Sequence, residues 1–218
     1  MTDYERLYTG LSHAAWGYFF LYVNFNLNFG SASINILPEF AGALLLLSAV
    51  DKLSAERRDM RLLRPLCMVL TAWHLANWLL ALIGSSLSGK FLFLDLLFTA
   101  VLLYFHFQFL TDMAAIAKKY QPEPDQDQPQ GYDLDRRILR RRTVLLVLST
   151  IADLVGSLVQ ATDFERLMKM EWPFGLLATA AVFLGAALVI VVVLIMVSLF
   201  QLRRYVRERG ETVPPAGE

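Results

Sequence analysis

The stretch FGLLATAAVFLGAALVIVVVLIMVSLF, residues 174–200, contains no charged side chain. A helix needs about 20 mostly apolar residues to cross the ~30 Å hydrocarbon core of a bilayer. A run of this length therefore predicts a transmembrane helix. It is also the stretch whose assignment depends on no other part of the chain.

The composition of the whole chain also favours an integral membrane protein. Of its 218 residues, 56% are hydrophobic and 18% are charged, whereas soluble domains average about 25% charged residues. The formal net charge is 0, so no overall field attracts nucleic acid, and we expect no nucleic-acid partner. The single cysteine, Cys67, excludes an intramolecular disulfide scaffold and a zinc site built from several cysteines.

Shorter apolar stretches accompany residues 174–200 and predict further membrane-spanning helices. The six expected spans are residues 11–29, 36–53, 62–84, 91–110, 143–160 and 174–200. Short connections between the first and second, third and fourth, and fifth and sixth spans make these pairs antiparallel neighbours. We therefore expect one all-α, polytopic membrane domain over residues 1–218, with six transmembrane helices arranged as three helical hairpins.

The placement of basic residues predicts the orientation of these spans. With six spans, all of the 20 Lys and Arg residues except Lys90, Arg166 and Lys169 fall on one side. An excess of Lys and Arg marks the cytoplasmic loops of a membrane protein. We therefore expect both termini in the cytoplasm (N-in and C-in) and a multi-pass protein of the plasma membrane, with the cytoplasmic (inner) membrane of a bacterium as the favoured compartment.

The loop between the fourth and fifth spans is a polar insertion. Residues 121–131 (QPEPDQDQPQG) are rich in Pro, Gln and Asp, which predicts a disordered cytoplasmic loop. Residues 132–142 form a basic segment. Its arginines are Arg136, Arg137, Arg140, Arg141 and Arg142. They serve the topology, and each would add roughly 1 kcal/mol of attraction to anionic lipid head groups. Docking of such lipids or of a protein partner is therefore a second expectation.

Polar residues recur at helical spacing in four of the predicted spans. They are His13, Gly17, Asn24 and Asn28 in the first, Thr71, His74, Asn77 and Trp78 in the third, Asp95, Thr99 and His106 in the fourth, and Ser149, Asp153, Ser157 and Gln160 in the fifth. Within hydrocarbon, such faces turn toward protein or water. Two interpretations remain open, because the stripes could join helices to one another or surround a polar cavity.

The position of each polar residue along its span predicts its depth in the membrane. A candidate solute-binding group is expected near the outer face: Asn24, Asn28, Glu39, Asn77, Trp78 and Asp95. At a rise of 1.5 Å per residue, Asp153 and His74 lie roughly 15–18 Å from the inner ends of their spans. An acid at mid-bilayer costs several kcal/mol without a partner. We therefore predict an Asp153–His74 pair that couples transport to a proton or another ion.

A metal site is a weaker alternative. His13 and His106 are expected at a common level, about 8 Å from the inner edge, and two histidines begin a zinc site. No carboxylate is expected near them to complete the site. The chain has no HExxH motif and no nucleotide-binding fingerprint. We expect no metal and no cofactor.

These features lead to three hypotheses about function. The first is a membrane protein that binds or transports a small solute, coupled to ions or protons or acting as the membrane subunit of a larger transporter. The alternative is an accessory or regulatory membrane subunit that docks lipid, or a membrane or cytoplasmic protein, through its basic inner loop. The third is an intramembrane metal-dependent enzyme at His13 and His106.

Overall fold

A computed structural model describes residues 3–23, 26–29, 32–35, 39–83, 85, 92–122, 133–161 and 171–212. This part of the chain is a helical bundle with one small β-hairpin. Its six α-helices are α1 (Asp3–Tyr22), α2 (Glu39–Leu53), α3 (Leu63–Leu82), α4 (Leu92–Tyr120), α5 (Leu134–Ala161) and α7 (Glu171–Thr212). Strands β1 (Asn26–Phe29) and β2 (Ala32–Asn35) follow α1, and a short 3-10 helix, η1 (Arg58–Leu62), precedes α3. The predicted all-α class is confirmed.

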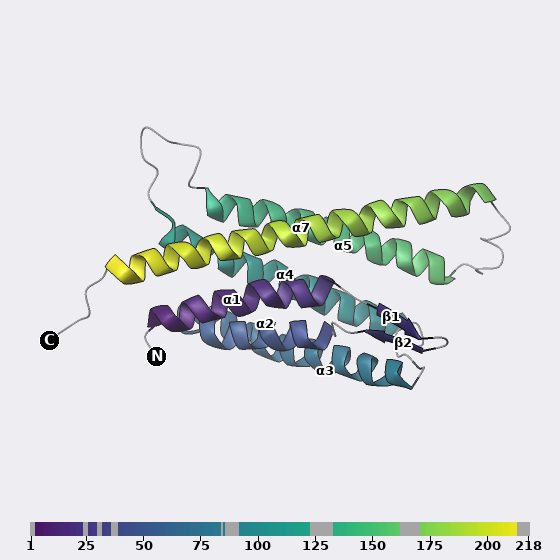
Figure 1. Cartoon of the computed structure of the whole chain (residues 1–218), viewed down its shortest axis with the longest axis horizontal. Helices are drawn as coiled ribbons and strands as arrows, with labels where there is room; N and C mark the ends of the chain where they lie inside the picture. Colours follow the sequence, from purple (N-terminus) through teal and green to yellow (C-terminus); the bar gives the residue numbers. More distant parts are fainter. Residues whose placement is uncertain are drawn as a thin grey trace.

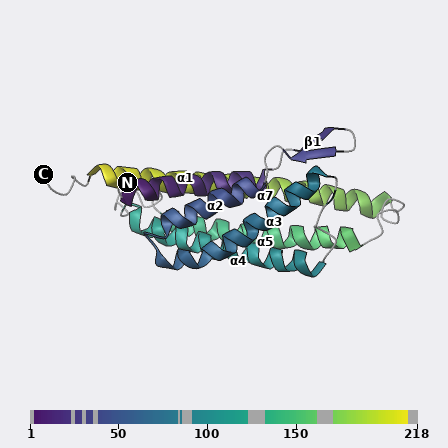
Figure 2. The same cartoon turned by 90° about the horizontal axis from the view of Figure 1, so that it is seen from below.

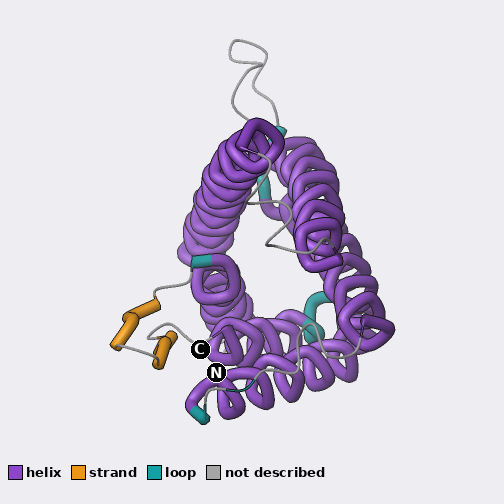
Figure 3. Tube along the Cα trace, turned by 90° about the vertical axis from the view of Figure 1, so that its right-hand side faces the viewer, coloured by secondary structure: helices purple, strands orange, loops and turns teal. Residues whose placement is uncertain are grey.

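The helices run along a common axis, with the β-hairpin at one end (Figures 1 and 2). We call this end the hairpin end. We call the opposite end, where α1 begins and α7 terminates, the basic end. Each helix contacts its neighbours in the order α1, α2, α3, α4, α5, α7, and α7 returns to α1. The bundle is therefore a ring of helices when it is viewed from the hairpin end (Figure 3).

Three helical segments are long and apolar enough to cross a membrane, by length and composition. Within the described residues they are Arg58–Leu82, Phe93–Tyr120 and Thr179–Glu211. Large apolar side chains cover their surfaces; Phe93 is 76% exposed and Phe183 is 72% exposed. An extended apolar surface is unfavourable in water and marks a site of contact with protein or lipid. These segments identify the chain as a candidate membrane protein.

The core lies toward the basic end of the bundle. Fully buried side chains there come from every helix of the ring: Leu11, Leu53, Leu63, Phe109, Ile138 and Leu199 are each at most 1% exposed. Toward the hairpin end, α3, α4, α5 and α7 present mainly exposed or half-buried residues. The bundle is therefore tightly packed at one end and open at the other.

Glycines allow α1 and α2 to approach each other closely. A Cβ atom built on Gly42 would lie 2.6 Å from the backbone nitrogen of Leu21 and 2.8 Å from the carbonyl oxygen of Gly17. Small residues at a helix interface allow this backbone contact in membrane bundles. The α1–α2 hairpin depends on two positions without side chains.

The first predicted span differs from the structure. Residues 11–29 were expected to form one helix, yet α1 ends at Tyr22 and residues 26–29 form β1, which pairs with β2 in antiparallel register. Asn28 therefore lies in a strand opposite Ser33, and it does not continue a helical face with His13 and Gly17. The residues from Asn24 to Phe29 alternate polar and apolar, which is the period of a strand.

The remaining helices are longer or shorter than the predicted spans. The helix α5 includes most of the basic segment and the fifth predicted span without a break, and α4 and α7 extend beyond their apolar stretches to Tyr120 and Thr212. The predicted loop 121–131 lies outside the described residues except for Gln121 and Pro122. The side-chain oxygen of Gln121 accepts a hydrogen bond from the backbone nitrogen of Leu134 (3.1 Å), and thereby caps the start of α5.

Candidate functional site

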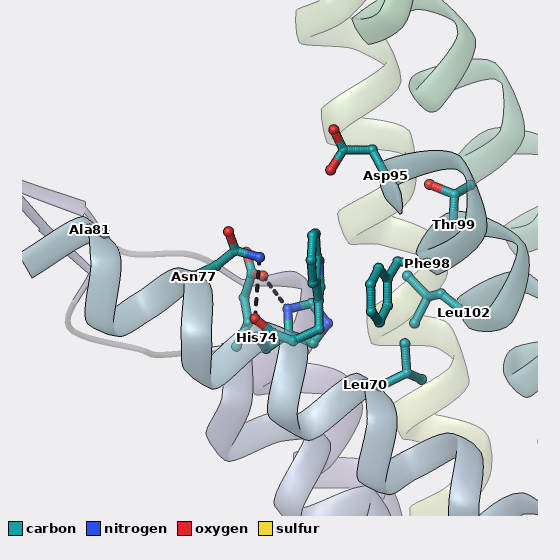
Figure 4. Close-up of a pocket in the computed structure, with 10 residues that line it drawn as sticks. Leu70, His74, Asn77, Ala81, Asp95, Phe98, Thr99 and Leu102 are labelled. Atoms are coloured by element: carbon teal, nitrogen blue, oxygen red, sulfur yellow. Dashed lines mark hydrogen bonds and ion pairs between the residues drawn. The ribbon is translucent and has the colours of Figure 1, made fainter. Parts of the chain in front are cut away.

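A pocket of about 420 Å³ lies between α3 and α4, with the start of α2 at its side. It forms where the ring of helices is least tightly closed, because α3 and α4 make fewer contacts with each other than the other sequential pairs do. The pocket is lined by Glu39 of α2, by Leu70, Trp73, His74, Asn77 and Ala81 of α3, and by Asp95, Phe98, Thr99 and Leu102 of α4. Figure 4 shows the α3 and α4 side chains on the two sides of the pocket.

A hydrogen-bonded contact between α2 and α3 forms one wall. Nδ1 of His74 lies 2.8 Å from Oε2 of Glu39. The histidine side chain is 14% exposed, whereas the glutamate is 37% exposed, so the carboxylate remains accessible from the pocket. A paired carboxylate that still meets solvent can accept a second partner.

Two aromatic rings connect α3 to α4. The rings of Trp73 and Phe98 are stacked, with centroids 3.9 Å apart and an interplanar angle of 15°. Leu70 and Leu102 continue this wall toward the core. Aromatic faces attract organic cations through their quadrupoles, so the wall is compatible with an apolar or a cationic ligand.

The other polar side chains approach the pocket from α3 and α4. Asn77 donates a hydrogen bond to the carbonyl oxygen of Trp73 (3.2 Å). Asp95 and Thr99, one helical turn apart on α4, lie across the pocket from Asn77 (Figure 4). Two carboxylates, one imidazole and one amide therefore share a site with apolar walls, the combination that orients a small polar ligand.

The structure places three residues of the expected solute-binding group beside His74, which was expected in a separate pair with Asp153. Glu39, His74, Asn77 and Asp95 line the same pocket. Trp78 packs its ring edge-on against Phe40 instead, with centroids 5.2 Å apart. The side chains of Asn24 and Asn28 lie outside the described residues. Sequence reasoning missed Trp73 and Phe98, although aromatic residues four positions before Asn77 and three after Asp95 fall on the same helical faces.

The partner of His74 differs from the predicted one. Its Nδ1 pairs with Glu39, whereas Asp153 is an exposed residue of α5 near enough to Tyr22 to interact with it electrostatically. The 15 residues of α2 span about 22 Å at 1.5 Å per residue. Its first residue, Glu39, therefore lies beside His74, which is near the middle of α3.

A second polar cluster lies in the core. The ring of His106 is fully buried; its Nδ1 is 3.1 Å from the Tyr18 hydroxyl and its Nε2 is 2.9 Å from the Tyr22 hydroxyl. His13 instead pairs with the Ser48 hydroxyl (2.9 Å). Among the described residues, no three His, Cys, Asp or Glu side chains gather closely enough to hold a metal ion. The spacing of Tyr18 and Tyr22, one turn apart, is the signal that sequence reasoning missed.

Two of the five arginines at the start of α5 form hydrogen bonds with neighbouring helices, and the other three are exposed or half-buried. Arg141 donates hydrogen bonds to the carbonyl oxygen of Leu194 and the hydroxyl of Ser198 on α7. Arg142 donates to the Thr111 hydroxyl (2.6 Å) and lies over the Phe107 ring. Of the remaining three arginines, Arg136 pairs with Asp133. Arg137 is half-buried, and Arg140 is exposed.

Ion pairs close the basic end. Arg57, before η1, lies 2.8 Å from the fully buried carboxylate of Asp112 on α4, and Glu56 pairs with Lys119 nearby. Arg209 of α7 donates a hydrogen bond to the carbonyl oxygen of Lys119 (2.7 Å). These contacts join α4 and α7 to the α2–η1 connection across the end of the ring.

Neither a protein-family model, nor a curated protein, nor a solved structure matches the chain. A helical bundle by itself is compatible with many activities, so a function has to be argued from the chemistry of a site. The pocket between α3 and α4 and the apolar helices around it are the observations from which that argument starts.

Proposed function

We propose that the chain is a membrane protein that binds a small polar or cationic solute in the pocket between α3 and α4 and carries it across the bilayer. The observation that carries the proposal is the pocket itself: about 420 Å³ in volume, with Glu39 and Asp95 among its lining residues. Pockets of roughly 300–1,000 Å³ with a few convergent polar groups are typical of small-molecule sites. Two carboxylates and a stacked aromatic pair favour a cation.

The membrane arrangement belongs to the same proposal. The six helices of the ring form the membrane domain, with the basic end in the cytoplasm and the pocket opening toward the other side, in the cytoplasmic membrane of a bacterium. The exposed Arg136 and Arg140 would then meet anionic lipid head groups. The energy for transport would come from an ion gradient or from a protein partner. The support is the distribution of basic residues and the apolar surface of α3, α4 and α7.

The test is ligand-dependent stabilisation of the purified protein. Tetramethylammonium, putrescine, glucose and glutamate are added separately, and the melting temperature is measured in detergent. We expect the cations to raise it, because a ligand that binds the folded state stabilises it by RT ln(1 + [L]/Kd), or about 2.7 kcal/mol at a hundredfold excess over Kd. Stabilisation by glucose or glutamate alone would contradict a cation site.

Matched variants locate the effect. Glu39→Gln and Asp95→Asn keep the shape of the pocket and remove one negative charge each, so each should reduce the stabilisation by the cations. Asp133→Asn is the control, because Asp133 lies at the basic end and pairs with Arg136. An equal loss in all three variants would indicate general charge screening, and the pocket would not be the site.

A further inference from the structure

We infer that the pocket exchanges a proton for its cationic solute, because His74 and the solute compete for the carboxylate of Glu39. This inference rests on the proposed function and adds the coupling chemistry to it. It differs from the pairing expected from sequence, since the acid that faces His74 is Glu39 and not Asp153. The geometry that supports it is one carboxylate shared between a histidine and a pocket.

Glu39 is placed to serve either partner. Its Oε2 is 2.8 Å from Nδ1 of His74, and its side chain is 37% exposed. His74, by contrast, is 14% exposed, so the imidazole has little solvent to replace the carboxylate as a partner. A solute that enters the pocket reaches Glu39 from the accessible side, and His74 occupies the other side.

Two acidic groups share the pocket with His74, and of these Glu39 is the one in direct contact with its ring. From α2 the facing group is Glu39, and from α4 it is Asp95, which lines the same pocket. His106 of α4 also interacts with His74 electrostatically, and its two ring nitrogens already pair with tyrosine hydroxyls. The charged residues of η1 lie at the opposite end of α3.

For a solute with a single positive charge, such as tetramethylammonium, the exchange conserves charge. When the ammonium group of the solute pairs with Glu39, the hydrogen bond from Nδ1 of His74 to Oε2 breaks. The imidazolium then loses one proton to water at the mouth of the pocket, and the neutral ring remains. One positive charge enters and one leaves, which avoids placing an extra cation in a region of low dielectric constant. No covalent bond of the solute changes.

Linkage gives the direction of the pH effect. Histidine changes charge between about pH 5 and pH 8, and a proton that is released on binding makes the apparent affinity fall as the pH falls. Between pH 8 and pH 5.5 we expect the apparent Kd of a cation to rise roughly tenfold. Reciprocally, a saturating cation should release protons most strongly at the acidic end of this range.

The experiment measures proton release directly. Tetramethylammonium chloride or putrescine dihydrochloride is titrated into the purified full-length protein in detergent, in two buffers of different ionisation enthalpy at pH 6. The difference in binding heat gives the number of protons released, and we expect close to one per cation site. Binding with no proton release overturns this inference and leaves the proposed function standing. No binding of either cation overturns both.

Two histidine variants provide the control. In His74→Gln the competitor is gone, so proton release should vanish and the apparent Kd at pH 5.5 should approach its value at pH 8. His13→Gln changes a histidine that pairs with Ser48 elsewhere in the bundle, and it should release protons as the unsubstituted chain does. Persistent release from His74→Gln overturns the assignment. If that variant fails to fold, the pH series of the unsubstituted chain decides: an unchanged Kd from pH 8 to pH 5.5 overturns it.

Discussion

His106 shows how one buried side chain is satisfied by hydroxyl groups alone. Both of its ring nitrogens pair with tyrosines of α1, and its exposed fraction is 0%. A buried polar atom without a partner costs about 1–3 kcal/mol. The histidine therefore fixes the rotation of α4 against α1 as well as filling space.

Removing one hydroxyl tests this role. We expect Tyr22→Phe to lower the free energy of unfolding by about 1 kcal/mol, since Nε2 of His106 loses its partner while the packing is kept. The measurement is a denaturant or thermal unfolding curve of the purified protein. Tyr104→Phe, at an exposed position of α4, is the control and should leave the curve unchanged. Equal stability of both variants would contradict a structural role for the pair.

At this scale, the sequence indicates which polar residues lie inside the bundle, but it does not indicate which of them are paired. The polar identity and depth of Glu39, His74, Asn77 and Asp95 are readable from the spans, and these residues do share a pocket. The partner of His74 is not readable, because it depends on where α2 begins relative to α3. An error of three residues in a helix start moves a side chain by about 4.5 Å, which is enough to exchange one partner for another.

The α1–α2 contact illustrates how elements approach each other. A methyl group on Gly42 would meet the backbone of α1 at Leu21 and Gly17, and backbone atoms cannot move aside as a flexible side chain can. The helices must separate to admit it. The contact therefore sets the distance between the first two helices.

We expect Gly42→Ala to destabilise the protein by about 1–3 kcal/mol, the usual cost of overpacking a close interface. Gly185→Ala is the matched control, because a Cβ at Gly185 on α7 meets nothing within 4 Å. That variant should be neutral or slightly stabilising, since Ala favours a helix more than Gly does. Unfolding curves of the two variants measured side by side decide the point.

Some helices and strands are easier to predict from the sequence than others. The uncharged run at residues 174–200 predicts the central part of α7, and apolar length alone predicts α3 and α4. The β-hairpin was missed because its Asn and Phe residues also fit the end of an apolar helix. The alternation of period two, with Gly30 and Ser31 between the strands, carries the better signal.

The orientation of the molecule as a whole is open to direct measurement. The one natural thiol, Cys67, is buried, so a single introduced cysteine reports its own surroundings. In intact bacterial cells, a membrane-impermeant maleimide should label Ser85→Cys, after α3, and should label Asp133→Cys, before α5, only after the membrane is opened. The unsubstituted chain is the background control. The reverse pattern would place the basic end outside, and labelling of both positions would contradict the proposed set of spans.

Because the bundle is densely packed at the basic end and sparsely packed at the hairpin end, its helices are held firmly at one end only. The ion pairs of Asp112 and Lys119 hold the basic end together, and the ends of α3 and α4 at the hairpin end have the greatest freedom to move. Because displacement grows with distance from a fixed point, a tilt of about 5° shifts the tip of a ~30 Å helix by roughly 2.5 Å. A tilt too small to disturb the packed end is therefore enough to change the separation of α3 and α4 at the hairpin end by roughly 2.5 Å.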